Sequence, residues 1–215
     1  MTKNVIYDTF YQLCKIFSDF YYCECPIIDK IDNVFYFLLM TTHNSINPKE
    51  TFYLNNDYVL RTHTSSLQKN MINKMIHNNI RKTFTGGVVF RKDDSSRHSY
   101  FFHQIDGLFY VDNVHEGIKT LMSKISKIFN KKIKYEIREA YFPFTYPSYE
   151  IYLYDECSNT YIEILGCGMM HSKIFQNINE KPKKIFAFGL GVERLAMIKY
   201  NINNIKKLKH TNIVK

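Results

Sequence analysis

One stretch with chemical potential pairs a basic residue with an alternating strand a few residues further on. Period-two alternation predicts that Phe102, Gln104 and Asp106 share one face of this strand, with His103 on the opposite face. A ring, an amide and a carboxylate in a row suit a ligand with a flat base and an ammonium group. Arg91, on the partner strand, can reach the same face, where its guanidinium suits a phosphate oxygen. Taken singly, each residue also fits an ordinary polar hairpin.

A second stretch, FAFGLGVER, runs from Phe186 to Arg194 and reads as a buried strand that opens into a helix. Gly189 and Gly191 would turn the chain and let a ligand approach the backbone closely. The helix N-terminus and Arg194 together favour phosphate. Gly-x-Gly by itself fits an ordinary packing turn. Glu193 and Arg194 directly after the turn favour the interpretation as a phosphate site.

The remaining sequence indicates which elements position these residues. Apolar periodicity predicts helices over residues 5–20, 67–80, 115–129, 170–178 and 193–200. Strands are predicted at residues 34–40, 51–53, 58–61, 88–91, 100–111, 133–137, 150–154, 161–165 and 185–188. Helices that flank hairpin-like strands indicate an α+β fold with a mainly antiparallel sheet. We expect one catalytic domain over residues 1–200 and a mobile basic C-terminal tail over 201–215.

The composition limits the class of protein but does not identify the function. With 45% hydrophobic residues the chain can build a core, so disorder is not expected. The net charge of +9 is compatible with a polyanion such as RNA, although lysines supplied by an A/T-rich genome explain it equally well. Five cysteines without zinc spacing or a secretory segment indicate reduced thiols and a cytoplasmic location. No apolar run is long enough to span a membrane.

Both stretches, in this order, resemble two signature motifs of class II aminoacyl-tRNA synthetases. Five words, two of which overlap these stretches, resemble the phenylalanine–tRNA ligase alpha-subunit family in particular. They are RTHTSSLQ at 61–68, FHQIDGL at 102–108, YFPFTYPS at 141–148, LGCGMMH at 165–171 and FAFGLGVERLAM at 186–197. The resemblance runs from about residue 5 to residue 200. It implies the class II catalytic fold, with ATP-dependent activation of L-phenylalanine and its transfer to tRNA(Phe).

The resemblance also implies roles toward ATP for matching residues. Arg91 would hold the α-phosphate and the amino-acid carboxylate, and Phe102 would stack on adenine. Asp93 and His98 would lie near the nucleotide, and Arg194 would bind the γ-phosphate end. Activation is an in-line attack by a carboxylate that is already ionised, so positioning and charge stabilisation suffice without a protein base.

Roles toward the amino acid follow in the same way. The residues implied for substrate binding are His63, Ser65, Gln68, Gln104, Asp106, Phe142, Phe144, Ala187 and Gly189. The polar members would orient the ammonium and carboxylate groups, and the two phenylalanines would pack on the substrate ring. Ala187 and Gly189 would leave room for a phenyl group. The family pattern often has Glu rather than Asp at position 106. A ring pocket without a hydroxyl partner rejects tyrosine by only about 100-fold, a shortfall that the family corrects on a separate beta subunit.

Departures from the family pattern affect the metal and the partners. Tyr146 stands where the family usually has a glutamate that binds Mg2+, so Glu150 or Glu163 would have to hold the metal. The expected partners are a beta subunit, in an α2β2 assembly, and tRNA(Phe). Since the resemblance starts close to residue 1, we expect the family's N-terminal coiled-coil arm to be missing. The alternative is a catalytically inactive class II-like module that binds tRNA or a protein. A single-chain organellar enzyme is disfavoured because only a short basic tail follows residue 200.

Overall fold

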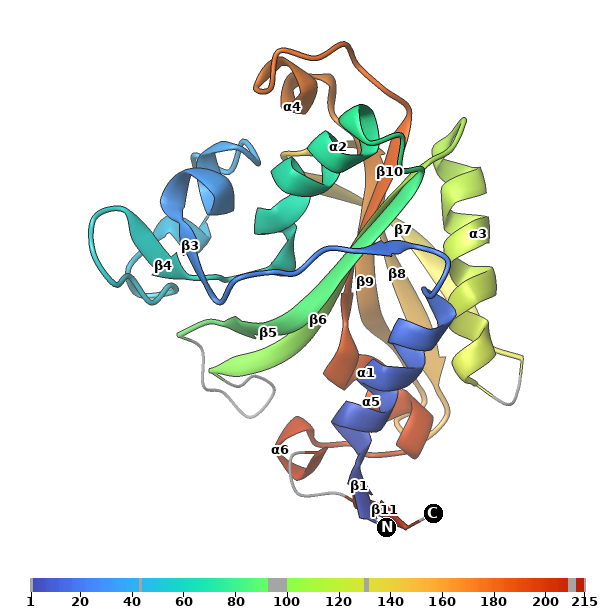
Figure 1. The fold of residues 1–215 in the computed structure, drawn as a ribbon. Coiled ribbons are helices and arrows are strands. Elements are labelled where there is room, and N and C mark those ends of the chain that lie inside the picture. The colour runs from blue at the N-terminus through green and yellow to red at the C-terminus, as the bar shows by residue number, and fades with distance from the viewer. Residues whose placement is uncertain (1, 43, 93–99, 130–131, 209–211, 215) are drawn as a thin grey trace.

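A seven-stranded sheet forms the centre of the molecule (Figure 1). The computed structural model describes residues 2–42, 44–92, 100–129, 132–208 and 212–214. In spatial order the strands are β2 (Tyr21–Tyr22), β5 (Lys82–Phe90), β6 (Phe101–Tyr110), β10 (Ile185–Gly191), β9 (Thr160–Met170), β8 (Thr145–Asp155) and β7 (Tyr135–Phe142). Neighbours run antiparallel, except that the short β2 lies parallel to β5. The prediction of an α+β fold with a mainly antiparallel sheet is confirmed.

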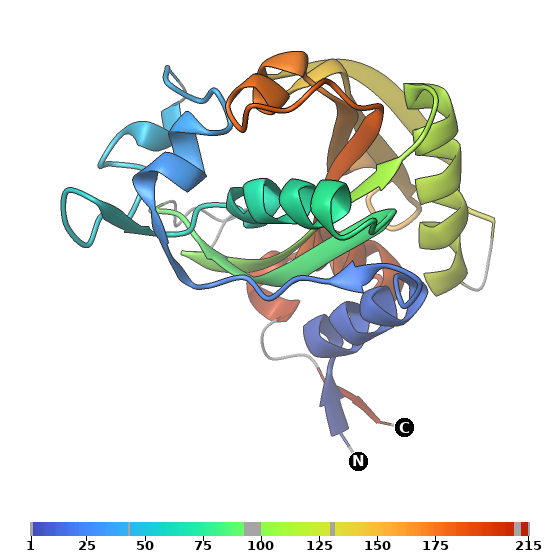
Figure 2. The ribbon, with the colours of Figure 1, turned by 45° about the horizontal axis from the view of Figure 1, so that its top comes forward.

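Helices cover both faces of this sheet (Figures 1 and 2). On one face lie α1 (Val5–Ile16), α3 (Val114–Ile125) and α5 (Val192–Tyr200), and on the other α2 (Gln68–His77) and α4 (Ser172–Gln176). Two short elements begin and end the fold side by side, because β1 (Thr2–Asn4) pairs antiparallel with β11 (Asn212–Val214). The smaller elements are β3 (Ile28–Lys30), β4 (Tyr58–Leu60), α6 (Ile205–Leu208), a π-helical turn Asp32–Tyr36 and 3-10 turns Asn44–Ile46, Thr64–Leu67 and Ser126–Ile128.

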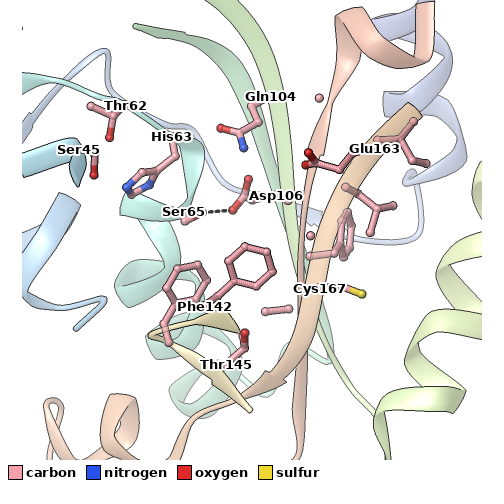
Figure 3. Close-up of a pocket in the computed structure, with 18 of the residues that line it drawn as sticks. Ser45, Thr62, His63, Ser65, Gln104, Asp106, Phe142, Thr145, Glu163 and Cys167 are labelled. Carbon is pink, nitrogen blue, oxygen red and sulfur yellow. Dashed lines mark hydrogen bonds between the residues drawn. The ribbon is translucent and has the colours of Figure 1, made fainter. Parts of the chain in front are cut away.

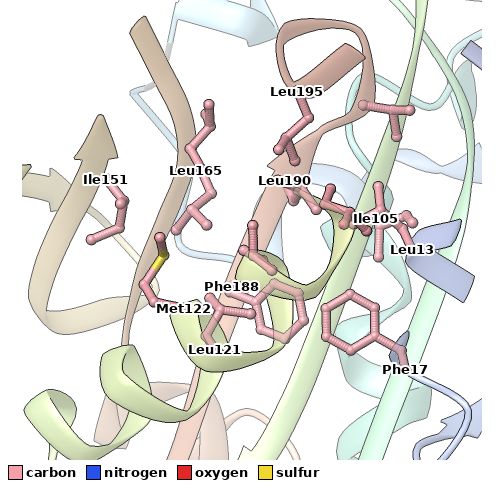
Figure 4. Close-up of a cluster of buried hydrophobic side chains, with 14 of the residues drawn as sticks. Leu13, Phe17, Ile105, Leu121, Met122, Ile151, Leu165, Phe188, Leu190 and Leu195 are labelled. Atoms are coloured by element: carbon pink, nitrogen blue, oxygen red, sulfur yellow. The ribbon is translucent and has the colours of Figure 1, made fainter. Parts of the chain in front are cut away.

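The larger core lies between the sheet and the helices α1, α3 and α5 (Figure 4). Phe188 of β10 stacks on Phe17, just after α1, with ring centroids 5.3 Å apart. Gly107 on β6 makes room for this pair, since a Cβ there would lie 2.4 Å from the Phe188 ring. The apolar stripe of α3 faces this core, and its Leu121 and Met122 are fully buried. This packing holds β6 and β10 rigidly side by side, which matters because both strands carry candidate site residues.

Several predicted boundaries were wrong. Residues 34–40 do not form a strand: Asp32–Tyr36 is π-helical and the chain then turns, because a short apolar run fits a buried helix and a strand equally well. The strand predicted at 88–91 begins at Lys82, the one predicted at 133–137 runs instead over Tyr135–Phe142, and those predicted at 150–154 and 161–165 each extend further. Residues 51–53 contribute only an isolated bridge through Tyr53. The expected tail is not wholly irregular, since it holds α6 and β11.

Candidate functional site

A cavity of about 510 Å³ opens over the face of the sheet opposite the larger core. Strands β6, β9 and β10 form its floor, the β7–β8 hairpin closes one end, and the segment around Thr62 to Gln68 forms a wall (Figure 3). The volume falls in the range that small-molecule sites occupy. The described lining includes most of the candidate residues, namely His63, Ser65, Gln68, Arg91, Phe102, Gln104, Asp106, Phe142, Phe144, Glu163, Ala187, Gly189 and Arg194.

The register of the sheet explains the floor of the cavity. Phe102, Gln104 and Asp106 all line it, as period-two alternation predicted. Asp106 lies opposite Gly189 on β10, and Gly189 lies opposite Gly166 on β9. A Cβ at Gly189 would sit 3.1 Å from Asp106 Oδ1, so the glycine leaves the carboxylate accessible from the cavity. The two glycines of the second motif therefore lie within β10 rather than in a turn after it, which corrects the sequence-based expectation.

Asp106 is a buried carboxylate held by two hydroxyl groups. Its side chain is 1% exposed, and it accepts hydrogen bonds from Thr64 Oγ1 and Ser65 Oγ, each at 2.5 Å. Burial raises the pKa of Asp106 from 3.8 to about 6, although hydrogen bonds from Ser65, Thr64 and Gln68 oppose this rise. A buried carboxylate that lacks a full counter-charge is a suitable partner for a ligand ammonium group.

Arg61 is a buried cation that sequence reasoning left without a role. Its Nε donates to the carbonyl of Val88 at 2.7 Å, and its Nη1 donates to the carbonyls of Cys25 and Pro26. These bonds fix the start of the segment that carries Thr64 and Ser65, and the positive charge lowers the pKa of Asp106 somewhat. The word RTHTSSLQ contains Arg61, but only the fold reveals that three carbonyls from distant segments meet there.

Two arginines line the other end of the cavity. The Arg91 guanidinium lies over the Phe102 ring at 5.0 Å from its centroid, and its Nε donates to the carbonyl of Thr62 at 3.2 Å. Arg194 Nη1 pairs with Glu163 Oε2 at 2.7 Å, and both side chains remain more than a third exposed. This region combines an aromatic face with fixed positive charge, an arrangement that suits a nucleotide.

Aromatic rings enclose the opposite end of the cavity. Phe142 and Phe144, at the tip of the β7–β8 hairpin, stack with centroids 6.1 Å apart and planes at 27°. The Phe142 ring rests above Gly166, where a Cβ would lie 2.6 Å from Phe142 Cζ. Ala187 is 2% exposed and keeps the end of the cavity open for an apolar group.

Not every candidate residue joins the cavity. Asp93 and His98 lie outside the described residues. Tyr146 is 78% exposed and Glu150 accepts a hydrogen bond from the Tyr152 hydroxyl at 2.8 Å, and neither lines the cavity. Of the two proposed metal ligands, only Glu163 therefore faces it.

A magnesium ion bound together with ATP needs only one or two protein carboxylates, so Glu163 would fit such a role. Among the described residues, no group of three or more His, Cys, Asp or Glu side chains forms a metal cage.

Sequence reasoning missed further lining residues: Met40, Ser45, Glu50, Thr62 and Cys167. The hydroxyl of Thr62 is buried and has no hydrogen-bond partner among the described residues, so it is available to a ligand. Thr62 lies within the quoted word RTHTSSLQ, where its position beside His63 was the only available signal. Met40 ends the segment that was wrongly predicted as a strand, and Ser45 and Glu50 follow it.

Comparison with known protein families agrees with the observed fold. The family model "tRNA synthetases class II core domain (F)" matches residues 1–214, and the chain belongs to this family. In the part of the chain that the structure describes, no helix is long and apolar enough to cross a membrane.

The most similar relatives named here are all phenylalanine–tRNA ligase alpha subunits. The chain is 42% identical over 175 residues to that of Ehrlichia canis (strain Jake), which covers 77% of this chain and 50% of the relative. It is 38% identical over 214 residues to that of Ehrlichia chaffeensis, a match that covers 93% of this chain and 61% of the relative. It is 37% identical over 209 residues to that of Phytoplasma australiense, a match that covers 93% of this chain and 57% of the relative. The resemblance inferred from the motif words is confirmed. The chain spans about half the length of the first of these relatives.

Proposed function

We propose that this chain activates L-phenylalanine with ATP and transfers it to tRNA(Phe), as the alpha subunit of a phenylalanine–tRNA ligase. The observation that carries the proposal is a single cavity with three chemically distinct regions. A buried carboxylate, Asp106, lies between an aromatic end at Phe142 and Phe144 and a cationic end at Arg91 and Arg194. An α-amino acid with an apolar ring and a nucleotide together require these three environments.

The polar residues would orient the amino acid. Asp106 would receive the ammonium group, and Gln104, whose Oε1 accepts a hydrogen bond from the backbone N–H of Thr64 at 3.3 Å, would help to fix it. His63 and Gln68 would complete the polar wall. With the ammonium group fixed and the ring packed against the phenylalanines, the carboxylate would point toward Arg91.

The reaction itself would be an in-line displacement. An oxygen of the phenylalanine carboxylate attacks the α-phosphorus of ATP, and the bond from that phosphorus to the bridging oxygen breaks to release pyrophosphate. Arg91 would neutralise charge on the α-phosphate while Phe102 supports the adenine, and Arg194 would hold the γ-phosphate. Mg2+, which Glu163 would hold together with the phosphates, supplies further charge neutralisation when bound. No side chain needs to act as a base, because the nucleophile is already ionised.

The aromatic end would select for a phenyl ring by shape. Thr145 contributes a hydroxyl to the cavity lining, but its Oγ1 is already hydrogen-bonded to Ser148 Oγ at 2.7 Å. A tyrosine hydroxyl would therefore gain little there, and we expect discrimination against tyrosine of only about 100-fold from this cavity. A separate beta subunit would then correct the errors made with tyrosine. It would also complete an α2β2 assembly, as the alpha-subunit names of the relatives suggest.

Phenylalanine-dependent ATP–pyrophosphate exchange tests the proposal, with the chain alone and with the beta subunit from the same source, over a range of Mg2+ concentrations. We expect exchange that disappears in Arg194→Ala. Arg138→Ala is the matched control, since Arg138 also pairs with a glutamate, Glu136 at 2.8 Å, but lies outside the cavity. A folded assembly that shows no exchange under any of these conditions would contradict the catalytic proposal and leave a module that only binds.

A further inference from the structure

A hydrogen-bonded pair, His103 and Glu193, ties β6 to the first turn of α5 at the nucleotide end of the cavity, which Glu193 itself helps to line. Glu193, in the first turn of α5, accepts hydrogen bonds from the backbone N–H of His103 at 2.9 Å and from His103 Nδ1 at 2.8 Å. The side chains of His103 and Glu193 are 17% and 7% exposed. A carboxylate accepts in both bonds, so Nδ1 carries the hydrogen.

The pair supplies a hydrogen bond at the point where the β6–β10 ladder ends. The β6–β10 ladder stops at Gln104 opposite Gly191, because the chain leaves β10 there and starts α5. The next N–H of β6 on this side belongs to His103 and would have no strand partner. Glu193 supplies the missing acceptor, so β6 keeps a fixed neighbour on both sides as far as His103.

Each member of the pair is adjacent to a residue that lines the nucleotide end. His103 lies between Phe102 and Gln104, and Glu193 directly precedes Arg194. Because neighbouring strand residues point to opposite faces, fixing the His103 side chain fixes the orientation of Phe102. Fixing Glu193 fixes the first turn of α5, from which Arg194 reaches the cavity.

Helix α1 completes the arrangement. The rings of Tyr7 and Phe10 pack edge-on against the His103 ring, at centroid distances of 5.9 Å and 6.1 Å. A carboxylate held in such surroundings is a weak source of stability, since apolar side chains of similar volume would often stabilise the fold as well or better. Its directional bonds, in contrast, fix geometry in a way that an apolar contact cannot.

We propose that Glu193 and His103 are a positioning pair whose mutual hydrogen bonds set the ATP-binding geometry of Phe102 and Arg194. This proposal deepens the proposed function and rests on it. The proposal predicts that loss of the pair affects the two substrates differently. Disruption of the pair should impair the use of ATP and leave phenylalanine binding at Asp106 and Phe142 close to that of the wild type.

Two substitutions at His103 separate the hydrogen bond from the packing. His103→Asn retains a side-chain donor close to the position of Nδ1, whereas His103→Phe retains the ring between Tyr7 and Phe10 but loses the donor. We expect His103→Phe to lower kcat/KM for ATP by about tenfold to a hundredfold, the usual cost of losing a charged hydrogen bond, and His103→Asn to restore most of it. His115→Phe is the matched control, because His115 is an exposed residue that lies 6.2 Å from the Tyr149 ring, away from the cavity.

The measurements are pyrophosphate exchange at varied ATP and varied phenylalanine, equilibrium binding of ATP by calorimetry, and thermal unfolding. Glu193→Gln provides a second route, and the double variant with His103→Phe should be no worse than the poorer single variant if the two residues act as a unit. Equal losses in His103→Asn and His103→Phe would overturn the proposal, as would unchanged use of ATP in His103→Phe. Equal losses toward both substrates that track a lower Tm would also overturn it, in favour of a purely structural role.

The binding measurement separates this proposal from the proposed function. If the wild-type assembly binds ATP but performs no exchange, the proposed function fails, and the ATP affinities of the His103 variants still decide on the positioning pair. If the wild type neither binds ATP nor performs exchange, both proposals fall together.

Discussion

The substitution Asp106→Asn should make the protein more stable while it weakens the binding of phenylalanine. Asp106 is fully buried, and burial raises its pKa from 3.8 to about 6. The folded protein therefore holds a proton that the unfolded chain loses between about pH 4 and pH 6. Stability contributed by this group is complete below pH 4 and is lost as the pH rises through about 6.

The size of the effect follows from the pKa. A rise from 3.8 to about 6 corresponds to about 3 kcal/mol, the cost of keeping the carboxylate ionised inside the folded protein at neutral pH. An asparagine has the same shape and no charge, and the hydroxyls of Thr64 and Ser65 can rotate to accept from and donate to its amide. We expect a gain in the free energy of unfolding of up to about 3 kcal/mol at pH 7.5 and roughly half of that at pH 5.

Urea unfolding at these two pH values measures the effect. Asp112→Asn is the matched control, because the Asp112 carboxylate is 82% exposed and the same chemical change there should leave stability nearly unaltered. The reasoning would be refuted by an Asp106→Asn variant that is less stable than the wild type at pH 7.5. A gain of the same size at both pH values would also refute it, since the effect would then have no connection with ionisation.

Four further predictions concern substrate use. Because binding of the ammonium group needs ionised Asp106, the affinity for phenylalanine measured by calorimetry should fall about tenfold for each pH unit below about 6, and a flat profile from pH 8 to pH 5 would contradict this role. In Gly166→Ala the new Cβ would lie 2.6 Å from Phe142 Cζ and should push the Phe142 ring into the cavity. We expect KM for phenylalanine in the exchange assay to rise by about tenfold or more. An unchanged KM would mean that Phe142 does not define the ring site. Ala187→Val should fill the end of the cavity and lower kcat/KM for phenylalanine by about 100-fold with an unchanged KM for ATP, whereas equal effects on both substrates would place Ala187 elsewhere in the mechanism. Arg194→Lys keeps the charge but loses the planar fork, so KM for ATP should rise by about tenfold, and a kinetically normal variant would show that charge alone suffices.

The motif words and the strand alternation were sufficient to predict many of the residues that line the cavity. The period-two pattern of β6 predicted correctly that Phe102, Gln104 and Asp106 share a face, because the pleat of a strand permits no other arrangement. The segment at residues 34–40 was predicted wrongly, since a short apolar run carries the same signal in a buried helical turn and in a strand. Met40 and Ser45 consequently remained unnoticed as lining residues.

The sequence alone determined the family, the α+β class and many, though not all, of the residues that face the cavity, because these depend on local spacing and on recognisable words. Only the tertiary structure decided how those residues interact. The pKa of Asp106 depends on burial by segments far apart in the chain, and Arg61 finds its three carbonyl partners only after folding. The pairing of Glu193 with His103, 90 residues away, likewise arises where one strand of the sheet ends beside another, a relation that no local pattern encodes.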